Sequence, residues 1–98
     1  MNRFKMKVEQ INNGKKGFFK ATDNNAEAGM MVYTWAGDTK IIIEHTEVNP
    51  AFKGKGVGQE MLLSAVKYAR ENHIKILPLC PFARSVFEKN EELQDVLF

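Results

Sequence analysis

The chain has 98 residues, 44% of them hydrophobic and 27% charged, and a formal net charge of +2 at pH 7. This size and composition are typical of one ordinary globular domain, which we assign to residues 1–98. The small basic excess argues against a large nucleic-acid-binding surface, and no apolar run approaches the roughly 20 residues of a membrane span.

The N-terminal part of the chain predicts an antiparallel meander. Its first segment, MNRFKMKVEQ, places charges where a signal peptide needs an apolar stretch, so we expect a cytoplasmic protein. Apolar residues alternate with polar ones over residues 4–11, which predicts a half-buried strand that includes Phe4. The Asn13-Gly14 pair then favours a type I′ hairpin turn, in which both central residues have positive φ. Further strands are predicted at 17–22 and 26–35, and such short connections join antiparallel neighbours.

A strand, a loop and a helix follow over residues 41–72. The strand at 40–48 begins with consecutive apolar residues, as expected when both of its faces are covered, and it ends at Asn49-Pro50. Apolar residues then recur at spacings of three and four from Val57 to Ala69, which predicts a helix with one buried face that ends near Asn72.

The loop between this strand and this helix has the composition of a phosphate-binding loop. Three glycines at alternate positions let backbone N–H groups approach an anion, and the helix N-terminus adds unpaired donors. The alternative is a tight connection in which the glycines only permit the turn. We predict phosphate binding by Lys53, Gly54, Lys55, Gly56, Val57, Gly58 and Gln59.

The C-terminal part predicts one more strand and a short helix. Residues 74–79 form the strand, which a right-handed crossover places parallel to the strand at 40–48. Pro81 suits the first position of a helix over residues 81–90, so Cys80 becomes its N-cap residue. Residues 93–98 are too few to assign. The predicted fold is α/β (α+β), with a mixed, mostly antiparallel sheet, one main helix and a short C-terminal helix.

These features together resemble the GNAT superfamily of acetyl-CoA-dependent N-acetyltransferases. The acyl-CoA signature of that family is Arg or Gln, two variable residues, Gly, one variable residue, then Gly or Ala, between a strand and a helix. Residues 53–58, KGKGVG, match it except at the first position, where Lys53 still provides a cation. The meander before the loop and the strand and helix after it fit the same family.

The chain looks in particular like a small single-domain GNAT subfamily. The marks of that subfamily here are His45-Thr46, the GKGVG loop and the segment PLCPFA at 78–83. The short turn at Asn13-Gly14 leaves no room for the helices that GNAT enzymes usually carry after the first strand. Because those helices wall the acceptor site, the resemblance implies an open acceptor face.

The resemblance implies transfer of an acetyl group from acetyl-CoA to an amine. The glycine loop would then bind the pyrophosphate of coenzyme A, and the backbone of Glu47 and Val48 would bind the pantetheine arm where the two parallel strands diverge. Two other functions stay open at this point. One is a coenzyme A binding module without transferase activity, and the other is a small nucleic-acid binder that uses Lys53 and Lys55.

Cys80 is a candidate catalytic residue. A helix N-terminus favours the thiolate form of a cysteine, and the resemblance places this position near the thioester sulfur. Cys80 could accept the acetyl group transiently or protonate the departing thiolate. The alternative is a small buried core residue. As the only cysteine, it forms no internal disulfide, which agrees with a reducing compartment, and it builds no multi-cysteine zinc site.

Phe87 and His45 complete the predicted site. Phe87 stands where many GNAT enzymes have the tyrosine that protonates the leaving thiolate, so we place it beside coenzyme A, and a phenyl ring donates no proton. His45 is a candidate base for the attacking amine because histidine titrates near neutrality. Strand alternation puts His45 and Glu47 on one face and Glu44 and Thr46 on the other. A histidine with a purely structural role is the alternative.

Overall fold

The computed structural model describes residues 6–98, so Phe4 of the first predicted strand lies outside the described residues. A five-stranded sheet has the order β1-β2-β3-β4-β5, in which the first four strands are antiparallel and β5 is parallel to β4. This mixed sheet confirms the predicted fold class. The elements are β1 Met6–Asn12, β2 Lys16–Asp23, β3 Ala26–Trp35, β4 Lys40–Val48, η1 Pro50–Phe52, α1 Val57–Asn72, β5 Lys75–Pro78, α2 Pro81–Lys89 and η2 Glu91–Val96.

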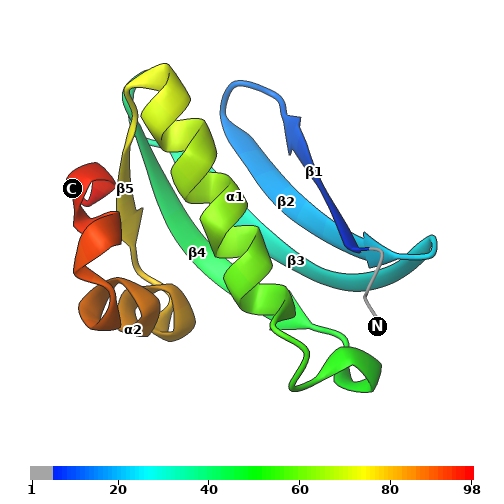
Figure 1. Cartoon of the computed structure of the whole chain (residues 1–98). Helices are drawn as coiled ribbons and strands as arrows, with labels where there is room; N and C mark the ends of the chain where they lie inside the picture. The colour runs from blue at the N-terminus through cyan, green and yellow to red at the C-terminus, as the bar shows by residue number, and fades with distance from the viewer. Residues whose placement is uncertain (1–5) are drawn as a thin grey trace.

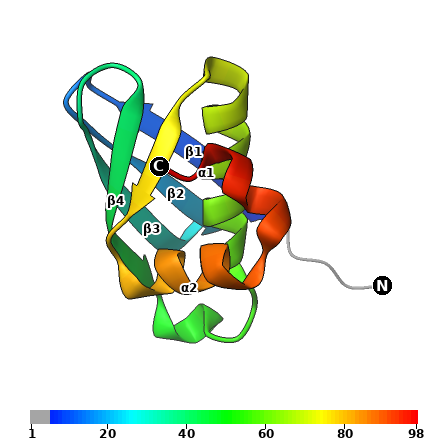
Figure 2. The same ribbon diagram turned by 90° about the vertical axis from the view of Figure 1, so that its left-hand side faces the viewer.

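The helices lie on one side of the sheet. Helix α1 crosses the sheet diagonally, and α2 and the C-terminal segment pack beside it near β5 (Figure 1). The view along the sheet shows that no element of residues 6–98 covers the opposite face (Figure 2). We call that surface the open face. Among the described helices, none is long and apolar enough to cross a membrane.

The hydrophobic core fills the space between α1 and the sheet. The apolar face predicted for the helix is confirmed, because its members from Val57 to Ala69 are all buried. The largest buried side chain is that of Tyr33, whose ring packs against Phe19 with centroids 5.4 Å apart. Helix α1 ends at Asn72 as predicted, and His73 follows in the left-handed conformation with a φ of 57°.

The first hairpin turn differs from the prediction. Only Gly14 has positive φ there, whereas a type I′ turn needs two such residues. The carboxamide oxygen of Asn13 accepts the N–H groups of Lys15 and Lys16, so Asn13 begins the turn and is not one of its central residues. Two consecutive positive φ values occur instead at Asn24 and Asn25, in the turn between β2 and β3.

Strand β4 contains a bulge at Glu44. The register against β3 passes from Ile43 opposite Tyr33 to His45 opposite Val32, which leaves Glu44 as the extra residue. A bulge reverses the alternation of faces beyond it. Thr46, which lies opposite the buried Met31, therefore shares the α1 side of the sheet with Ile43.

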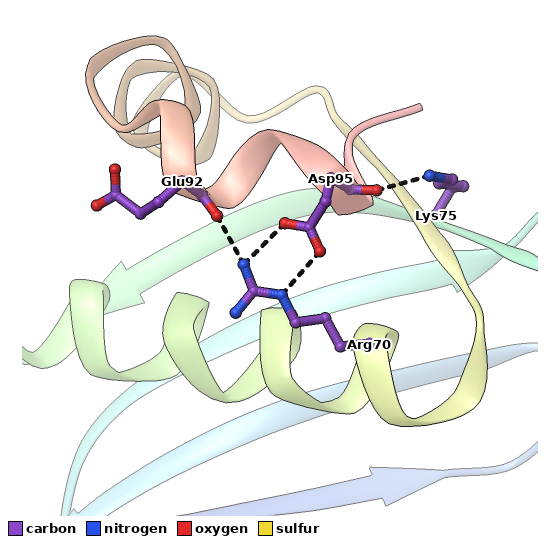
Figure 3. A network of polar contacts seen from close by, with 4 residues as sticks. All are labelled: Arg70, Lys75, Glu92 and Asp95. Atoms are coloured by element: carbon purple, nitrogen blue, oxygen red, sulfur yellow. Dashed lines mark hydrogen bonds and ion pairs between the residues drawn. The ribbon is translucent and has the colours of Figure 1, made fainter.

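The C-terminal residues left unassigned from the sequence cover the outer edge of β5. Leu97 pairs with Ile76 in parallel, and the N–H of Phe98 donates to the Ile76 carbonyl at 2.9 Å. Figure 3 shows how side chains hold this segment. Arg70 donates to both carboxylate oxygens of Asp95 at 2.8 and 2.7 Å and to the Glu92 carbonyl at 2.6 Å.

Substitution of Arg70 by Gln is expected to loosen this C-terminal segment. The Arg70 guanidinium holds the pKa of Asp95 below its usual value of 3.8. A depressed carboxyl pKa contributes stability above the unfolded value that is lost as the pH falls through the folded value. At pH 6 the Phe98 amide should lose about threefold in hydrogen-exchange protection, and the difference from wild type should shrink as the pH falls below 3.8.

Lys67→Gln is the matched control, because it removes the exposed Lys67–Glu71 pair on the same helix, which borders β1 and β2. Equal protection of Phe98 in the Arg70→Gln and Lys67→Gln proteins would contradict the role of the Arg70–Asp95 pair.

Substitution of Thr34 by Val is expected to stabilise the protein. The Thr34 hydroxyl oxygen is buried and finds no hydrogen-bond partner within residues 6–98. Valine keeps the shape and removes this desolvated polar group, so the free energy of unfolding should rise by about 1 kcal/mol. Urea denaturation measures the change, and a lower unfolding midpoint would contradict the explanation.

Candidate active site

Strands β4 and β5 diverge after Ile43. Their parallel pairing ends at Ile43 and Pro78. The N–H groups of Leu79 and Cys80 both donate to the Ile43 carbonyl, at 3.0 and 3.1 Å, which turns the chain out of the sheet. Strand β4 continues to Val48 beyond the last pair with β5, so the two strands enclose an opening.

The backbone of Thr46 and Val48 faces this opening. The N–H of Asn49 donates to the Ala28 carbonyl of β3, and backbone groups alternate in direction along an antiparallel strand. The backbone of His45 and Glu47 is therefore turned toward β3, and that of Thr46 and Val48 points away from it. Of the two residues predicted for the pantetheine arm, Val48 has the backbone orientation that this role needs, and Thr46 is the second residue that has it.

The glycine loop delivers the first turn of α1 to the same end of the sheet. Gly54 and Gly56 have φ values of 79° and 78°, and each faces open space where a Cβ would be. The N–H groups of Lys53 and Lys55 are used within the loop, where they donate to the carbonyls of η1. Gly56 is the N-cap of α1 and provides no side-chain cap, so the first amides of this helix keep their donors.

A groove of about 520 Å³ joins the loop to the opening in the sheet. Of the residues predicted for the cofactor site, seven line it, whereas Lys55, Glu47 and Phe87 do not. The lining consists of Thr46, Val48, Phe52, Lys53, Gly54, Gly56, Val57, Gly58, Gln59 and Phe82. Phe52 and Phe82 were not predicted from the sequence, where two aromatic residues near a glycine loop carry no specific signal.

Gly58 has a different neighbour from the other two loop glycines. A Cβ at this position would lie 2.8 Å from the Phe82 ring, which packs across the first turn of α1. The absence of a side chain at Gly58 therefore allows the contact between α1 and α2 that closes one side of the groove.

Cys80 lies at the N-cap of α2, as predicted. Its sulfur accepts the Ala83 N–H at 3.4 Å and lies 3.2 Å from the Thr46 hydroxyl. The residue is only 4% exposed and does not itself line the groove, whereas Thr46 does. Thr46 therefore stands between the groove and the sulfur.

His45 and Glu47 lie away from the groove. Both are exposed, and the bulge turns them to the open face, opposite Val32 and Met30 of β3. Glu47 and Glu27 line a second hollow of about 490 Å³ beside the end of β4. The structure thus separates His45 from Cys80 by the thickness of the sheet.

Phe87 is part of the core, with 1% of its surface exposed, and it borders a different pocket near the C-terminus.

The two tyrosines of the chain are also remote from the groove lining. Tyr33 accepts a hydrogen bond from Gln10 at 2.8 Å, and its pKa is raised by burial, which this bond partly offsets. Tyr68 borders the gap between α1 and β1. Neither tyrosine lines the groove, whereas the Cys80 sulfur contacts Thr46 in its lining.

Comparison with known proteins gives consistent matches. The family model for GCN5-related N-acetyl-transferases matches residues 17–96. A GCN5-like protein from Staphylococcus aureus is 33% identical, with a TM-score of 0.68 over 92% of this chain and 87% of that chain. A ribosomal-protein-alanine N-acetyltransferase from Brucella melitensis biovar Abortus has a similar fold, with a TM-score of 0.69 at 15% identity over 79% of this chain and 62% of that chain.

A curated relative, Protein NATD1 from Xenopus tropicalis, is 23% identical over 64 residues, or 65% of this chain. The aligned part is 59% of NATD1, so the chain spans less than two thirds of that relative. The family model covers most of the chain, and the structure shows the sheet, the glycine loop and the strand opening in one arrangement. The chain belongs to the GCN5-related N-acetyltransferase family.

Proposed function

We propose that the protein transfers an acetyl group from acetyl-CoA to an amine, with residues 1–98 acting as a single acetyl-CoA-binding domain. One observation carries this proposal. The uncapped first turn of α1 and the unpaired edge of β4 open onto the same groove. An elongated ligand with a phosphate at one end and amide groups along its arm suits that arrangement.

The groove residues fit coenzyme A in two places. The amides of Val57, Gly58 and Gln59 at the helix N-terminus are donors for the pyrophosphate, and Lys53 adds a positive charge at the groove. The N–H and carbonyl groups of Thr46 and Val48 can bond an arm that contains amides, as a neighbouring strand would. Acetyl-CoA supplies the activated acetyl group.

The acceptor amine would approach from the open face. The donor groove lies on the α1 side of the sheet, and we place the route between the two faces where β4 has no pairing with β5 beyond Ile43. His45 and Glu47 are exposed on the open face, where His45 can take the proton of an attacking amine. A backbone N–H of β4 at the opening can stabilise the oxyanion.

Cys80 can act in either of two ways. In direct transfer, the amine attacks the thioester and Cys80 donates its proton to the departing thiolate. In the covalent route, the Cys80 sulfur bonds to the acetyl carbon, the bond to the coenzyme A sulfur breaks, and the coenzyme A thiolate takes up the proton that Cys80 lost. The amine then attacks the acetylated Cys80 and restores the thiol.

Substitution of Gly56 by Glu tests the loop. The new carboxylate would lie beside the first amides of α1 and repel a pyrophosphate, so affinity for coenzyme A should fall by about 100-fold, as measured by isothermal titration calorimetry. Gly56→Ala is the matched control, because it imposes the same strain at positive φ without a charge. A folded Gly56→Glu protein with wild-type affinity would show that the loop is not the binding site.

Substitution of Cys80 by Ala tests the chemistry. Loss of the thiol should lower the rate of acetyl transfer by about 100-fold while affinity for coenzyme A is retained. Mass spectrometry of the wild-type protein after incubation with acetyl-CoA alone distinguishes the two routes, because only the covalent route leaves an acetyl group on Cys80. An unchanged transfer rate in the Cys80→Ala protein would exclude both roles, and binding of acetyl-CoA without transfer to any amine, polyamine or peptide would contradict the enzyme proposal itself.

A further inference from the structure

We propose that Thr46 is the positioning residue for Cys80: its hydroxyl group fixes the sulfur beside the opening between β4 and β5 and donates a hydrogen bond to the thiolate. This inference rests on the role proposed for Cys80 and adds a residue that the sequence pattern did not assign.

The set of contacts around the Cys80 sulfur is the first argument. The Thr46 Oγ1 and Cys80 Sγ atoms are 3.2 Å apart, and the Ala83 N–H lies 3.4 Å from the same sulfur. A thiolate has no proton to give, so in that state both neighbours must act as donors. The sulfur is then held from two sides, by the first turn of α2 and by β4.

The bulge at Glu44, which sets the face of the sheet on which Thr46 lies, is the second argument. If Glu44 took a regular place in the ladder, alternation from Ile43 would turn His45 toward the α1 side and Thr46 toward the open face. The observed register instead places Thr46 opposite the buried Met31, on the side where Cys80 lies. A threonine side chain on a strand also has few χ1 rotamers, so its hydroxyl direction is well defined.

The location of Thr46 between the groove and the sulfur is the third argument. Thr46 lines the groove, whereas Cys80 is 4% exposed and lies behind it. Among the residues that line the groove, Thr46 is the one whose side chain hydrogen-bonds to the sulfur. Any group in the groove that reacts with Cys80 therefore meets Thr46 first, and the hydroxyl sets the direction from which the sulfur is reached.

The rate at which iodoacetamide alkylates Cys80, measured without acetyl-CoA, tests this proposal. All cysteine labelling reports on this residue, because the chain has one cysteine. Thr46→Val keeps the side-chain shape and removes the donor, so alkylation at pH 7 should slow by about tenfold. Thr46→Ser restores the hydroxyl and should recover the rate to within about threefold of wild type. Thr34→Val, the same substitution at a hydroxyl with no partner in residues 6–98, should leave the rate unchanged.

Wild-type alkylation in the Thr46→Val protein, or an equally slow rate in the Thr46→Ser protein, would overturn the proposal. Should Thr46→Val fail to fold, three-bond NMR couplings of Thr46 in the wild-type protein decide instead: a single χ1 rotamer supports the positioning role, and rotamer averaging rejects it. The assay contains no acetyl donor. A wild-type protein without transferase activity would therefore refute the proposed function and leave the test of Thr46 intact.

Discussion

The candidate site depends on how the hydrogen bonding of β5 ends. A parallel strand normally continues its evenly spaced ladder, but here two successive N–H groups converge on the single carbonyl of Ile43. That arrangement satisfies both donors and ends the pairing at once. The chain then enters α2 through Cys80, while β4 runs on without its neighbour. The opening, the exposed edge of β4 and the location of the sulfur all follow from this one junction.

Packing of α1 against the sheet brings the second half of the site to this junction. The helix is held along its length by the contact of its buried face with β2, β3 and β4. Its N-terminus therefore has a fixed place relative to the end of β4, although the loop before it is exposed. The Phe82 ring against Gly58 adds a contact from α2. Side-chain packing therefore holds β4, α1 and α2 together around the groove.

Local chemistry explains which features the sequence could predict. The buried positions of α1, its end at Asn72 and the capping role of Cys80 depend on periodicity and on residues close in the chain, and all three are present. The first hairpin was located correctly, but its turn type was wrong because the side chain of Asn13 competes for the turn amides. The C-terminal segment was not assigned, because its place depends on Ile76 and Arg70, which are distant in sequence.

The candidate site was predictable to a similar degree. The loop from Lys53 to Gln59 has a recognisable composition, and most of it lines the groove. The contact of Thr46 with Cys80 joins residues 34 positions apart, and no pattern in the sequence indicates it. The sequence could not show which face of the sheet His45 occupies. That face depends on the bulge at Glu44, and the alternation of apolar and polar residues does not reveal a bulge.

The bulge at Glu44 also decides which side chains of β4 border the groove. Beyond the bulge, β4 has two sets of side chains that would exchange faces if Glu44 took a regular place in the ladder. In this chain one set is Thr46 and Val48, which border the groove, and the other is His45 and Glu47, which are exposed on the far side. Regular pairing of Glu44 would therefore put an imidazole in place of a hydroxyl next to the sulfur, while the helices and the glycine loop stay in place. The chemistry of the site thus depends on the backbone conformation of one strand residue as well as on which side chains the strand carries.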